Sequence, residues 1–264
     1  MQCGKFGVIE GNDGTGKTVQ TKLLVERLAR EGFSVATYDF PQYGNNVFAE
    51  TVAAYLRNEF GIATKVHPYP ASMLYAADRW KTSERMKQDL NEGKIVVANR
   101  FASANIGHQG GKYRMKIREL ESVIPRSQGT AMSPEYRKRF EEKNRQDIER
   151  AKQEMKEFFN WLREMEFEER GFGTLYPDLT VILNLDPRVA QRLKEQQRNA
   201  EGHAKDGHES NLEYLECVSE TFKELAGREK GWKLVECGDG QEGILPPEAI
   251  HEMVWRHFKE LLAA

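Results

Sequence analysis

The sequence predicts an α/β fold in which a five-stranded parallel sheet lies between two layers of helices. Short apolar runs rich in β-branched residues alternate along the chain with longer segments that carry an apolar residue every three or four positions. Strands separated by helices pair in parallel through right-handed crossovers, and the helices then cover both faces of the sheet. The expected strands are residues 5–10, 34–40, 94–98, 179–185 and 232–237.

Helical periodicity follows these strands in order. The first helix begins after Thr18 and is predicted to end at Gly32, because glycine is a common helix stop. Its apolar face consists of Val19, Leu23, Leu24 and Leu28. Further helices are expected at residues 46–58, 70–91 and 211–226, and after Pro187 and Pro246. Ligands of such sheets bind at the carboxyl ends of the strands, where Glu10, Phe40 and Asn99 fall.

Residues 133–170 form one long, highly charged segment that is predicted to be helical. The segment contains no glycine, ten basic residues and eleven acidic residues, and its one proline follows Ser133 at a helix-start position. An apolar stripe with steps of three and four consists of Ala151, Met155, Phe158, Leu162 and Met165. One interpretation is a solvated helix that packs this stripe on the domain. The other is that the stripe, together with residues 126–132, forms an oligomer contact or covers a ligand pocket.

Composition excludes several classes of protein. At 264 residues the chain is long enough to bury a substantial core, and we expect a single domain over residues 1–264. The net charge of −2 gives no sign of a nucleic-acid-binding surface or a polybasic membrane surface. Apolar runs are only strand-sized and the first strand begins too early for a signal peptide, so we expect a cytoplasmic protein that binds neither nucleic acid nor membrane. Cys3, Cys217 and Cys237 lack metal-site spacing and are expected to be reduced structural thiols.

A phosphate-binding loop follows the first strand directly. Residues 11–18 have the pattern G-x-x-x-x-G-K-T, in which glycines let backbone N–H groups turn toward phosphate. Lys17 can then reach the β- and γ-phosphates, and the Thr18 hydroxyl can bind Mg²⁺. The N-terminus of the next helix favours the same anion. We therefore expect a nucleotide phosphate site composed of Gly11, Asn12, Asp13, Gly14, Thr15, Gly16, Lys17 and Thr18.

Five further patterns separate the possible classes of P-loop protein. The N-K-x-D base reader of a GTPase is absent from the sequence. The chain instead contains Asp-Phe-Pro-Gln-Tyr-Gly (39–44), Met-Leu-Tyr-Ala-Ala-Asp-Arg-Trp (73–80), Asn-Arg-Phe followed by Asn-Ile-Gly-His-Gln-Gly-Gly (99–111), Tyr-Pro-Asp-Leu-Thr (176–180) and Asp-Gly-His-Glu-Ser-Asn-Leu-Glu-Tyr-Leu (206–215). With these patterns the chain resembles the thymidylate kinases over nearly its whole length.

The resemblance implies a three-layer P-loop kinase fold with a lid at about residues 195–209 and a helical insertion at about 133–170. It further implies a homodimer that transfers the γ-phosphate of ATP to dTMP in dTTP synthesis, with Mg²⁺ as cofactor. Such a lid closes over ATP and excludes water. Arg198 in the lid is the candidate for a further contact to ATP, with Lys205 as a second candidate, and a solvated loop charge is the alternative role for both.

The same resemblance implies roles for individual side chains. Asp13 is expected to bind the 3′-hydroxyl of the deoxyribose and to help place the acceptor phosphate, and Arg79 to read a thymine carbonyl. Lys17 and Arg100 are expected to neutralise charge during transfer, which makes Lys17, Arg100 and Asp13 the catalytic candidates. The remaining acceptor contacts are assigned to Phe40, Tyr75, Asn105, His108 and Gln109. A salt bridge is the alternative role for Arg79, and core packing is the alternative for the two aromatic residues.

Two positions depart from the common family pattern. Asn99 stands where the family usually has aspartate, and Gln42 stands where many members have arginine. A neutral amide is a weaker Mg²⁺ ligand than a carboxylate, so Glu10 at the neighbouring strand end is an alternative ligand, either directly or through a water molecule. The candidate metal ligands are therefore Thr18, Glu10 and Asn99.

Two other functions stay open at this point. A deoxynucleoside kinase shares the Glu-Gly-Asn start of the loop but needs a general base for the 5′-hydroxyl, a role open to Glu10. A P-loop protein that binds nucleotide but has lost turnover through Asn99 is the other alternative. The preference between dTMP and dUMP also stays open, because ordinary apolar residues form a pocket for a 5-methyl group.

Overall fold

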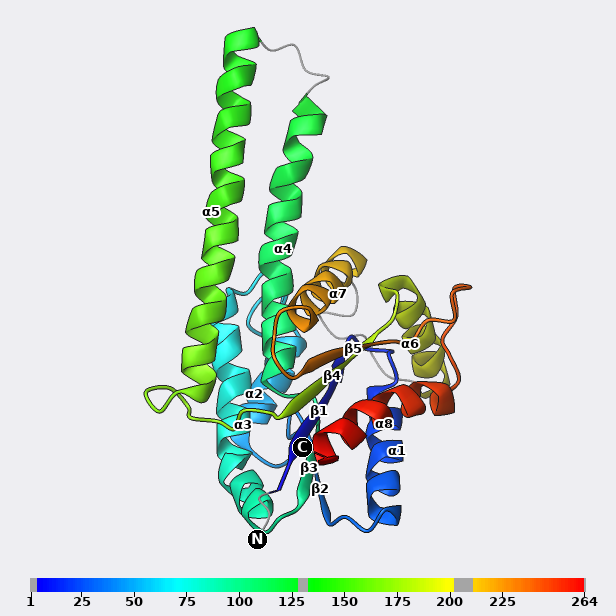
Figure 1. The fold of residues 1–264 in the computed structure, drawn as a ribbon. Helices are drawn as coiled ribbons and strands as arrows, with labels where there is room; N and C mark the ends of the chain where they lie inside the picture. Colours follow the sequence, from blue (N-terminus) through cyan, green and yellow to red (C-terminus); the bar gives the residue numbers. More distant parts are fainter. Residues whose placement is uncertain (1–3, 128–132, 202–210, 264) are drawn as a thin grey trace.

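A five-stranded parallel sheet forms the centre of the molecule, as the sequence predicts (Figure 1). The computed structural model describes residues 4–127, 133–201 and 211–263. The strands are β1 (Phe6–Gly11), β2 (Val35–Asp39), β3 (Ile95–Asn99), β4 (Leu179–Asn184) and β5 (Trp232–Glu236). Their order is β2-β3-β1-β4-β5, so β1 lies in the middle. All residues of β1, β3 and β4 are buried, as is typical of a parallel sheet covered on both faces.

Helices cover both faces of this sheet and give three layers (Figure 1). They are α1 (Lys17–Arg30), α2 (Val47–Leu56), α3 (Pro68–Asn91), α4 (Ala102–Ser127), α5 (Pro134–Phe167), α6 (Pro187–Glu201), α7 (Leu212–Ala226) and α8 (Pro247–Ala263). On one face, Ile9 of β1 shares a core with Leu24 of α1 and Phe258 of α8. On the other face, Val8 of β1 shares a core with Met86 of α3. Neighbouring strand residues enter different cores because side chains alternate between the two faces.

Helices α4 and α5 form a hairpin that projects well beyond the sheet (Figure 1). Helix α5 occupies most of residues 133–170, and Ser133 caps it by accepting a hydrogen bond from the N–H of Tyr136 at 3.3 Å. The predicted stripe packs inside the molecule: Ala151, Phe158, Leu162 and Met165 are buried and Met155 is partly buried. Further along, Asn144 of α5 donates to the carbonyl of Leu120 on α4 at 2.9 Å.

The sequence patterns do not predict helix α4, which the structure contains. Its segment contains Gly107, Gly110 and Gly111, and glycine disfavours the interior of a helix. In the structure these glycines permit close packing against α7. A Cβ atom at position 107 would lie 2.3 Å from the ring of Phe222, and one at position 111 would lie 2.6 Å from Val218. The glycines therefore allow the two helices to approach each other rather than end α4.

Helix α6 extends further than expected. It runs to Glu201 and so includes residues 195–201, which the sequence predicts as the first part of a polar lid between helices. Glutamate, glutamine and arginine are good helix formers, so the helix continues through this part. The rest of the expected lid, residues 202–209, lies outside the described residues, as does the side chain of Arg198.

Two of the cysteines are free and buried, as expected for structural thiols. Burial raises the pKa of Cys217 to about 11 and the pKa of Cys237 to about 12. Cys3 lies outside the described residues. Within the described part of the chain, no helix combines the length and the apolar character needed to cross a membrane.

Candidate functional site

The phosphate-binding loop joins the end of β1 to the start of α1, as the motif predicts. Gly14 and Gly16 have φ angles of 83° and 87°, in the left-handed region that favours glycine. Gly14 also lies against the backbone of α6, because a Cβ atom there would be 2.3 Å from the carbonyl oxygen of Ala190. The loop thus leads directly into the N-terminus of α1, a position that favours bound phosphate.

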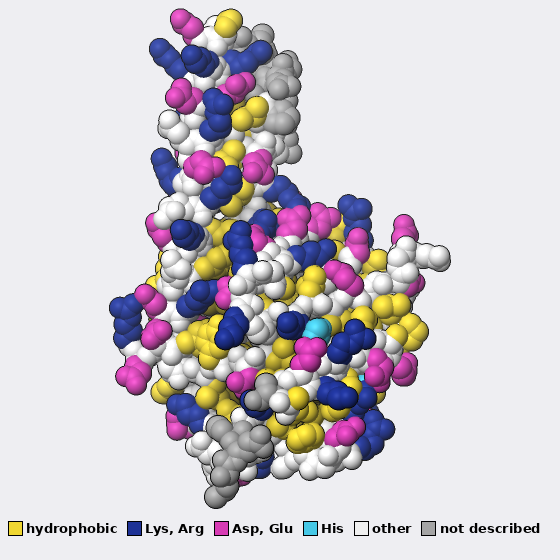
Figure 2. Space-filling model, viewed as in Figure 1, with side chains coloured by type: hydrophobic (Ala, Val, Ile, Leu, Met, Phe, Trp, Pro, Cys, Tyr) yellow, Lys and Arg dark blue, Asp and Glu magenta, His cyan; other side chains and the backbone are white. Residues whose placement is uncertain are grey.

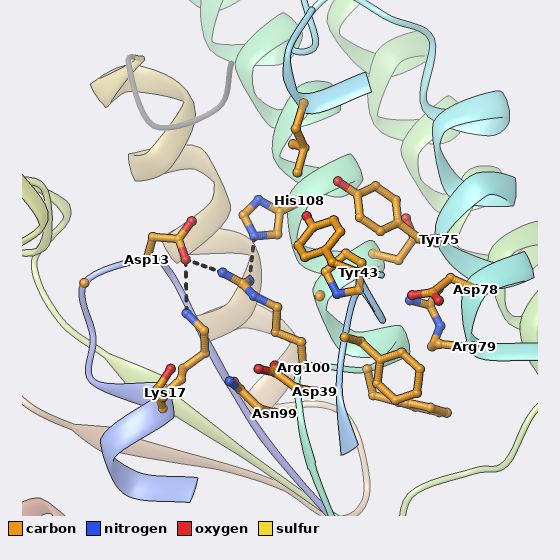
Figure 3. Close-up of a pocket in the computed structure, with 18 of the residues that line it drawn as sticks. Asp13, Lys17, Asp39, Tyr43, Tyr75, Asp78, Arg79, Asn99, Arg100 and His108 are labelled. Atoms are coloured by element: carbon orange, nitrogen blue, oxygen red, sulfur yellow. Dashed lines mark hydrogen bonds and ion pairs between the residues drawn. The ribbon is translucent and has the colours of Figure 1, made fainter. Parts of the chain in front are cut away.

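Two cations converge on one carboxylate beside this loop (Figure 3). Lys17 Nζ donates to the carbonyl of Asn12 at 2.8 Å and to Asp13 Oδ1 at 3.4 Å. The guanidinium of Arg100 forms an ion pair with the same oxygen of Asp13. Burial by itself raises the pKa of Asp13, but Arg100 and Lys17 outweigh burial and hold this pKa below its ordinary value. Burial, together with the charge of Arg100, lowers the pKa of Lys17 to about 8.

Arg100 is held at the end of β3 by a backbone contact to β1 and a side-chain contact to α4. Its φ angle of 65° is unusual for a residue other than glycine, and its backbone N–H donates to the carbonyl of Ile9 at 2.9 Å. Its Nη1 lies 3.5 Å from Nε2 of His108 on α4. His108 Nδ1 in turn lies 3.2 Å from the hydroxyl of Tyr214 on α7. The sheet and two helices therefore position this guanidinium beside the loop.

A cavity of about 570 Å³ extends from this cluster to residues of β2, α3 and α4. One part is lined by Asp13, Gly14, Gly16, Lys17, Thr18 and Arg100, and another by Phe40, Tyr75, Arg79, Asn105 and Gln109, while His108 lines the pocket beside Arg100. The structure thus brings the predicted phosphate residues and acceptor residues into one pocket. Gly11, Asn12 and Thr15 do not line it; they lie within the loop, where Asn12 Nδ2 donates to the carbonyl of Leu215 at 3.2 Å.

Arg79 lines the far end of the pocket and is also engaged in a buried ion pair. Its side chain is 2% exposed, and Nε donates to Glu166 Oε2 at 3.1 Å while Nη2 contacts Oε1. Glu166 is fully buried near the end of α5. The sequence reasoning missed Glu166, although its place four residues after Leu162 puts it on the apolar face of the helix.

Two amide side chains beside Arg79 have unused hydrogen-bonding groups. Among the described residues, neither polar atom of Gln109 has a hydrogen-bond partner, and neither does Oδ1 of Asn105. Both side chains are buried, and both line the pocket. Buried polar groups without partners are uncommon, so these amides mark a place where a ligand would supply the missing hydrogen bonds.

Phe40 and Tyr75 each pack on another aromatic ring and also line the pocket. Phe40 is 4% exposed and packs edge-to-face on Phe101, with ring centres 5.5 Å apart. Tyr75 packs in the same way on Tyr55, at 6.1 Å. Phe40 is buried and Tyr75 is partly buried, and both residues also line the pocket. The pocket also includes Tyr43, which the sequence reasoning did not single out.

Glu10, an expected metal ligand, does not line the pocket itself, although its Oε1 lies 3.7 Å from Nη1 of the pocket residue Arg100. Its Oε1 accepts from the N–H of Gly11 at 3.0 Å, and its Oε2 accepts from the hydroxyl of Ser103 at 2.9 Å. Asp39, at the end of β2, is a carboxylate that does line the pocket. Asp39 is the register partner of Asn99 on β3, and the two side chains lie beside each other (Figure 3). In the described part of the chain, no three His, Cys, Asp or Glu side chains are grouped to hold a metal ion.

Comparisons with known proteins agree with this geometry. A family model described as thymidylate kinase matches residues 9–170. A thymidylate kinase from Pelotomaculum thermopropionicum is 36% identical over 121 residues, which cover 46% of this chain and 54% of that protein. A thymidylate kinase from Exiguobacterium sp. is 29% identical over 197 residues, which cover 70% of this chain and 89% of that protein. The chain spans about half the length of the first curated relatives it matches.

A solved structure shows the same fold. The thymidylate kinase of Candida albicans superposes with a TM-score of 0.65 at 19% identity, covering 98% of this chain and 92% of that one. This likeness, together with the parallel sheet, confirms the predicted α/β P-loop kinase fold.

Proposed function

Because the chain belongs to the thymidylate kinase family, we propose that it transfers the γ-phosphate of ATP to dTMP and so forms dTDP for dTTP synthesis. One observation carries this proposal: a single cavity joins the phosphate-binding loop to Arg79, Asn105 and Gln109. The loop end suits the polyphosphate of a donor nucleotide, and the opposite end suits the polar edge of a base.

The residues at the loop end match what phosphoryl transfer requires. Transfer between two phosphates depends mainly on positioning and on neutralising charge. Lys17 and Arg100, which contact Asp13 in the structure, would bind phosphate oxygens when nucleotides enter. Arg100 lies between the loop and His108, where a guanidinium would bridge donor and acceptor phosphates. Asp13 would then be free to accept a hydrogen bond from the 3′-hydroxyl of the acceptor sugar, and Arg198 would contact ATP from the lid.

Mg²⁺ would complete the donor end of the pocket. Thr18, Asp39 and Asn99 line this end, and all three offer oxygen ligands, the kind that Mg²⁺ prefers. Asn99 Oδ1 has no hydrogen-bond partner among the described residues, which leaves this oxygen for a ligand. Bound Mg²⁺ would supply positive charge that neutralises the transferring phosphates. Few protein ligands are needed, since Mg²⁺ usually keeps several waters and binds substrate phosphates.

The deoxynucleoside kinase alternative is not favoured by the structure. That reaction needs a general base within reach of the 5′-hydroxyl. Glu10, the residue considered for this role, is fully buried and already accepts hydrogen bonds from Gly11 and Ser103. A phosphate acceptor needs no such base, and this agrees with transfer to dTMP.

An acceptor panel tests the proposed reaction. The protein with Mg²⁺ and ATP is offered dTMP, dUMP, thymidine or no acceptor, and ADP formation is followed. We expect ADP formation that depends on dTMP. Formation with thymidine but not dTMP would indicate a deoxynucleoside kinase, and none with any acceptor would indicate a nucleotide-binding protein without turnover. Arg100→Met should lower kcat by about 10²–10³-fold, as loss of other preorganised donors does.

We further propose a cytoplasmic homodimer with one domain in each chain, which binds neither nucleic acid nor membrane. Apolar side chains on α2 and α3, namely Val47, Met73 and Trp80, are exposed and support a contact between chains. On the face shown in Figure 2, basic and acidic side chains are intermingled, which supports the absence of a nucleic-acid-binding surface. Light scattering should give about twice the chain mass of 30.4 kDa.

A further inference from the structure

Glu166 lies behind the wall of the pocket rather than in it. Its side chain is fully buried near the end of α5 and does not line the cavity. Its carboxylate nevertheless contacts two residues that do. It accepts from Arg79 of α3 through Nε and Nη2, and from Nδ2 of Asn105 of α4 at 3.1 Å. One side chain of the hairpin therefore holds two pocket residues from two other helices.

These contacts fix which end of the Asn105 amide is available to a ligand. Asn105 Nδ2 donates to the carbonyl of Ser72 at 3.0 Å and to Glu166 Oε1 at 3.1 Å. A carbonyl and a carboxylate only accept, so a rotated amide would place Oδ1 against two acceptor oxygens. Glu166 thus keeps the amide nitrogen on its own side, and Oδ1 is left as an acceptor without a partner in the described part of the chain.

The same carboxylate fixes Arg79 as a donor. The guanidinium is planar, and its Nε and Nη2 are both bound to Glu166. Nη1 does not take part in these bonds to Glu166, so it is the nitrogen of Arg79 that we assign to a ligand. Since a guanidinium only donates, Arg79 and Asn105 together present one donor and one acceptor in a set orientation.

We infer that Glu166 is the positioning residue that makes this pocket select 4-keto pyrimidine nucleotides over 4-amino ones, an inference that rests on the proposed function. Thymine and uracil carry the acceptor O4 beside the donor N3–H, which complements Arg79 and Asn105. Cytosine carries an amino donor beside the acceptor N3, which opposes both. Gln109 does not discriminate in this way, because no described residue orients its amide and it is free to match either base.

The test is the ratio of the dissociation constants for dCMP and dTMP, measured by calorimetry on the parent and on Glu166→Gln. A glutamine amide donates as well as accepts, so the carbonyl of Ser72 alone would then orient the Asn105 amide. We expect the ratio to fall at least tenfold, while the dissociation constant for Mg²⁺-ATP stays within twofold. Glu224→Gln is the matched control, because it makes the same change in the ion pair with Arg114 outside the pocket and should leave the ratio unchanged.

Equal weakening of both nucleotides in Glu166→Gln, with the ratio unchanged, would overturn the inference. If Glu166→Gln does not fold, Glu166→Asp serves instead. It keeps the negative charge but is one methylene shorter, so it should not hold Arg79 and Asn105 together, and an unchanged ratio would again count against the inference. The proposed function has a separate readout, since it fails if the parent forms no dTDP from dTMP and ATP, whatever the binding ratios are.

Discussion

Lys112 on α4 is a buried cation, and replacing it is expected to change how stability depends on pH. Its side chain is 7% exposed, and Nζ donates to the hydroxyl of Tyr55 at 2.9 Å and to the carbonyl of Val66 at 2.8 Å. Both partners are neutral, and burial lowers the pKa of Lys112 to about 7. The unfolded chain therefore binds more protons than the folded one between pH 7 and 10, and the free energy of unfolding rises with pH across this range.

The size of the effect follows from the change in pKa. A shift of the Lys112 pKa from 10.5 to about 7 lowers the free energy of unfolding below pH 7 by about 5 kcal/mol. Between pH 7 and pH 9 the parent should regain about 2 kcal/mol of this amount. Lys112→Met cannot bind the proton, so its unfolding free energy should lack this rise. The unfolding free energy of Lys112→Met minus that of the parent should therefore be larger at pH 7 than at pH 9, by about 2 kcal/mol.

Urea unfolding of the parent and of Lys112→Met at pH 7 and pH 9 measures this difference. Other groups that titrate in the same range are present in both proteins, so they cancel in the comparison. Lys116→Met is the control, because Lys116 lies one turn further along α4, is 53% exposed and pairs with Glu154. Parallel pH dependence in the parent and Lys112→Met would refute the reasoning, and so would an equal response in the Lys116 variant.

Three further predictions concern the loop and the pocket. Gly14→Ala should lower the free energy of unfolding by about 2–4 kcal/mol and abolish ATP binding. Gly32 has a similar φ, but a Cβ atom there would meet open space, so Gly32→Ala should lower the free energy of unfolding by only about 1 kcal/mol, as measured by chemical denaturation. Lys17 has a pKa of about 8, so ATP affinity should fall as pH rises through 8, with proton uptake on binding in calorimetry; pH-independent affinity from 7 to 9 would contradict this. In paramagnetic resonance with Mn²⁺ and ATP, Asp39→Asn should weaken metal binding about tenfold and Asn99→Asp should strengthen it; no change in either variant would remove both residues from the metal site.

Most of the fold could be predicted because strands and amphipathic helices leave periodic patterns in the sequence. The five strands fall within one or two residues of their expected bounds. Helix α4 could not be predicted, since its glycines look like helix breakers until Phe222 and Val218 of α7 are seen packed against them. The role of such a glycine depends on a neighbour that is distant in sequence, and periodicity along one segment carries no information about that neighbour.

The candidate site divides in the same way. The phosphate-binding loop could be predicted from contiguous residues. Arg79 and Gln109 could be named as candidate acceptor contacts because the chain resembles the thymidylate kinases. Glu166 could not, because its contact with Arg79 joins positions 87 residues apart. The hydrogen bond from Ser103 to Glu10 could not be predicted either, because the strand-end position of Glu10 does not reveal it.

Asp13 binds the same two cations that a phosphate would bind. Because it is part of the loop, it acts as a tethered competitor whose local concentration far exceeds that of simple anions in solution. A ligand with a single charge, such as chloride, gains little by displacing it. A nucleotide brings several charges and a base, and would therefore have more binding energy with which to displace Asp13. If nucleotide phosphates bind Lys17 and Arg100 as we propose, they must first displace Asp13, and this would make the loop less accessible to simple anions.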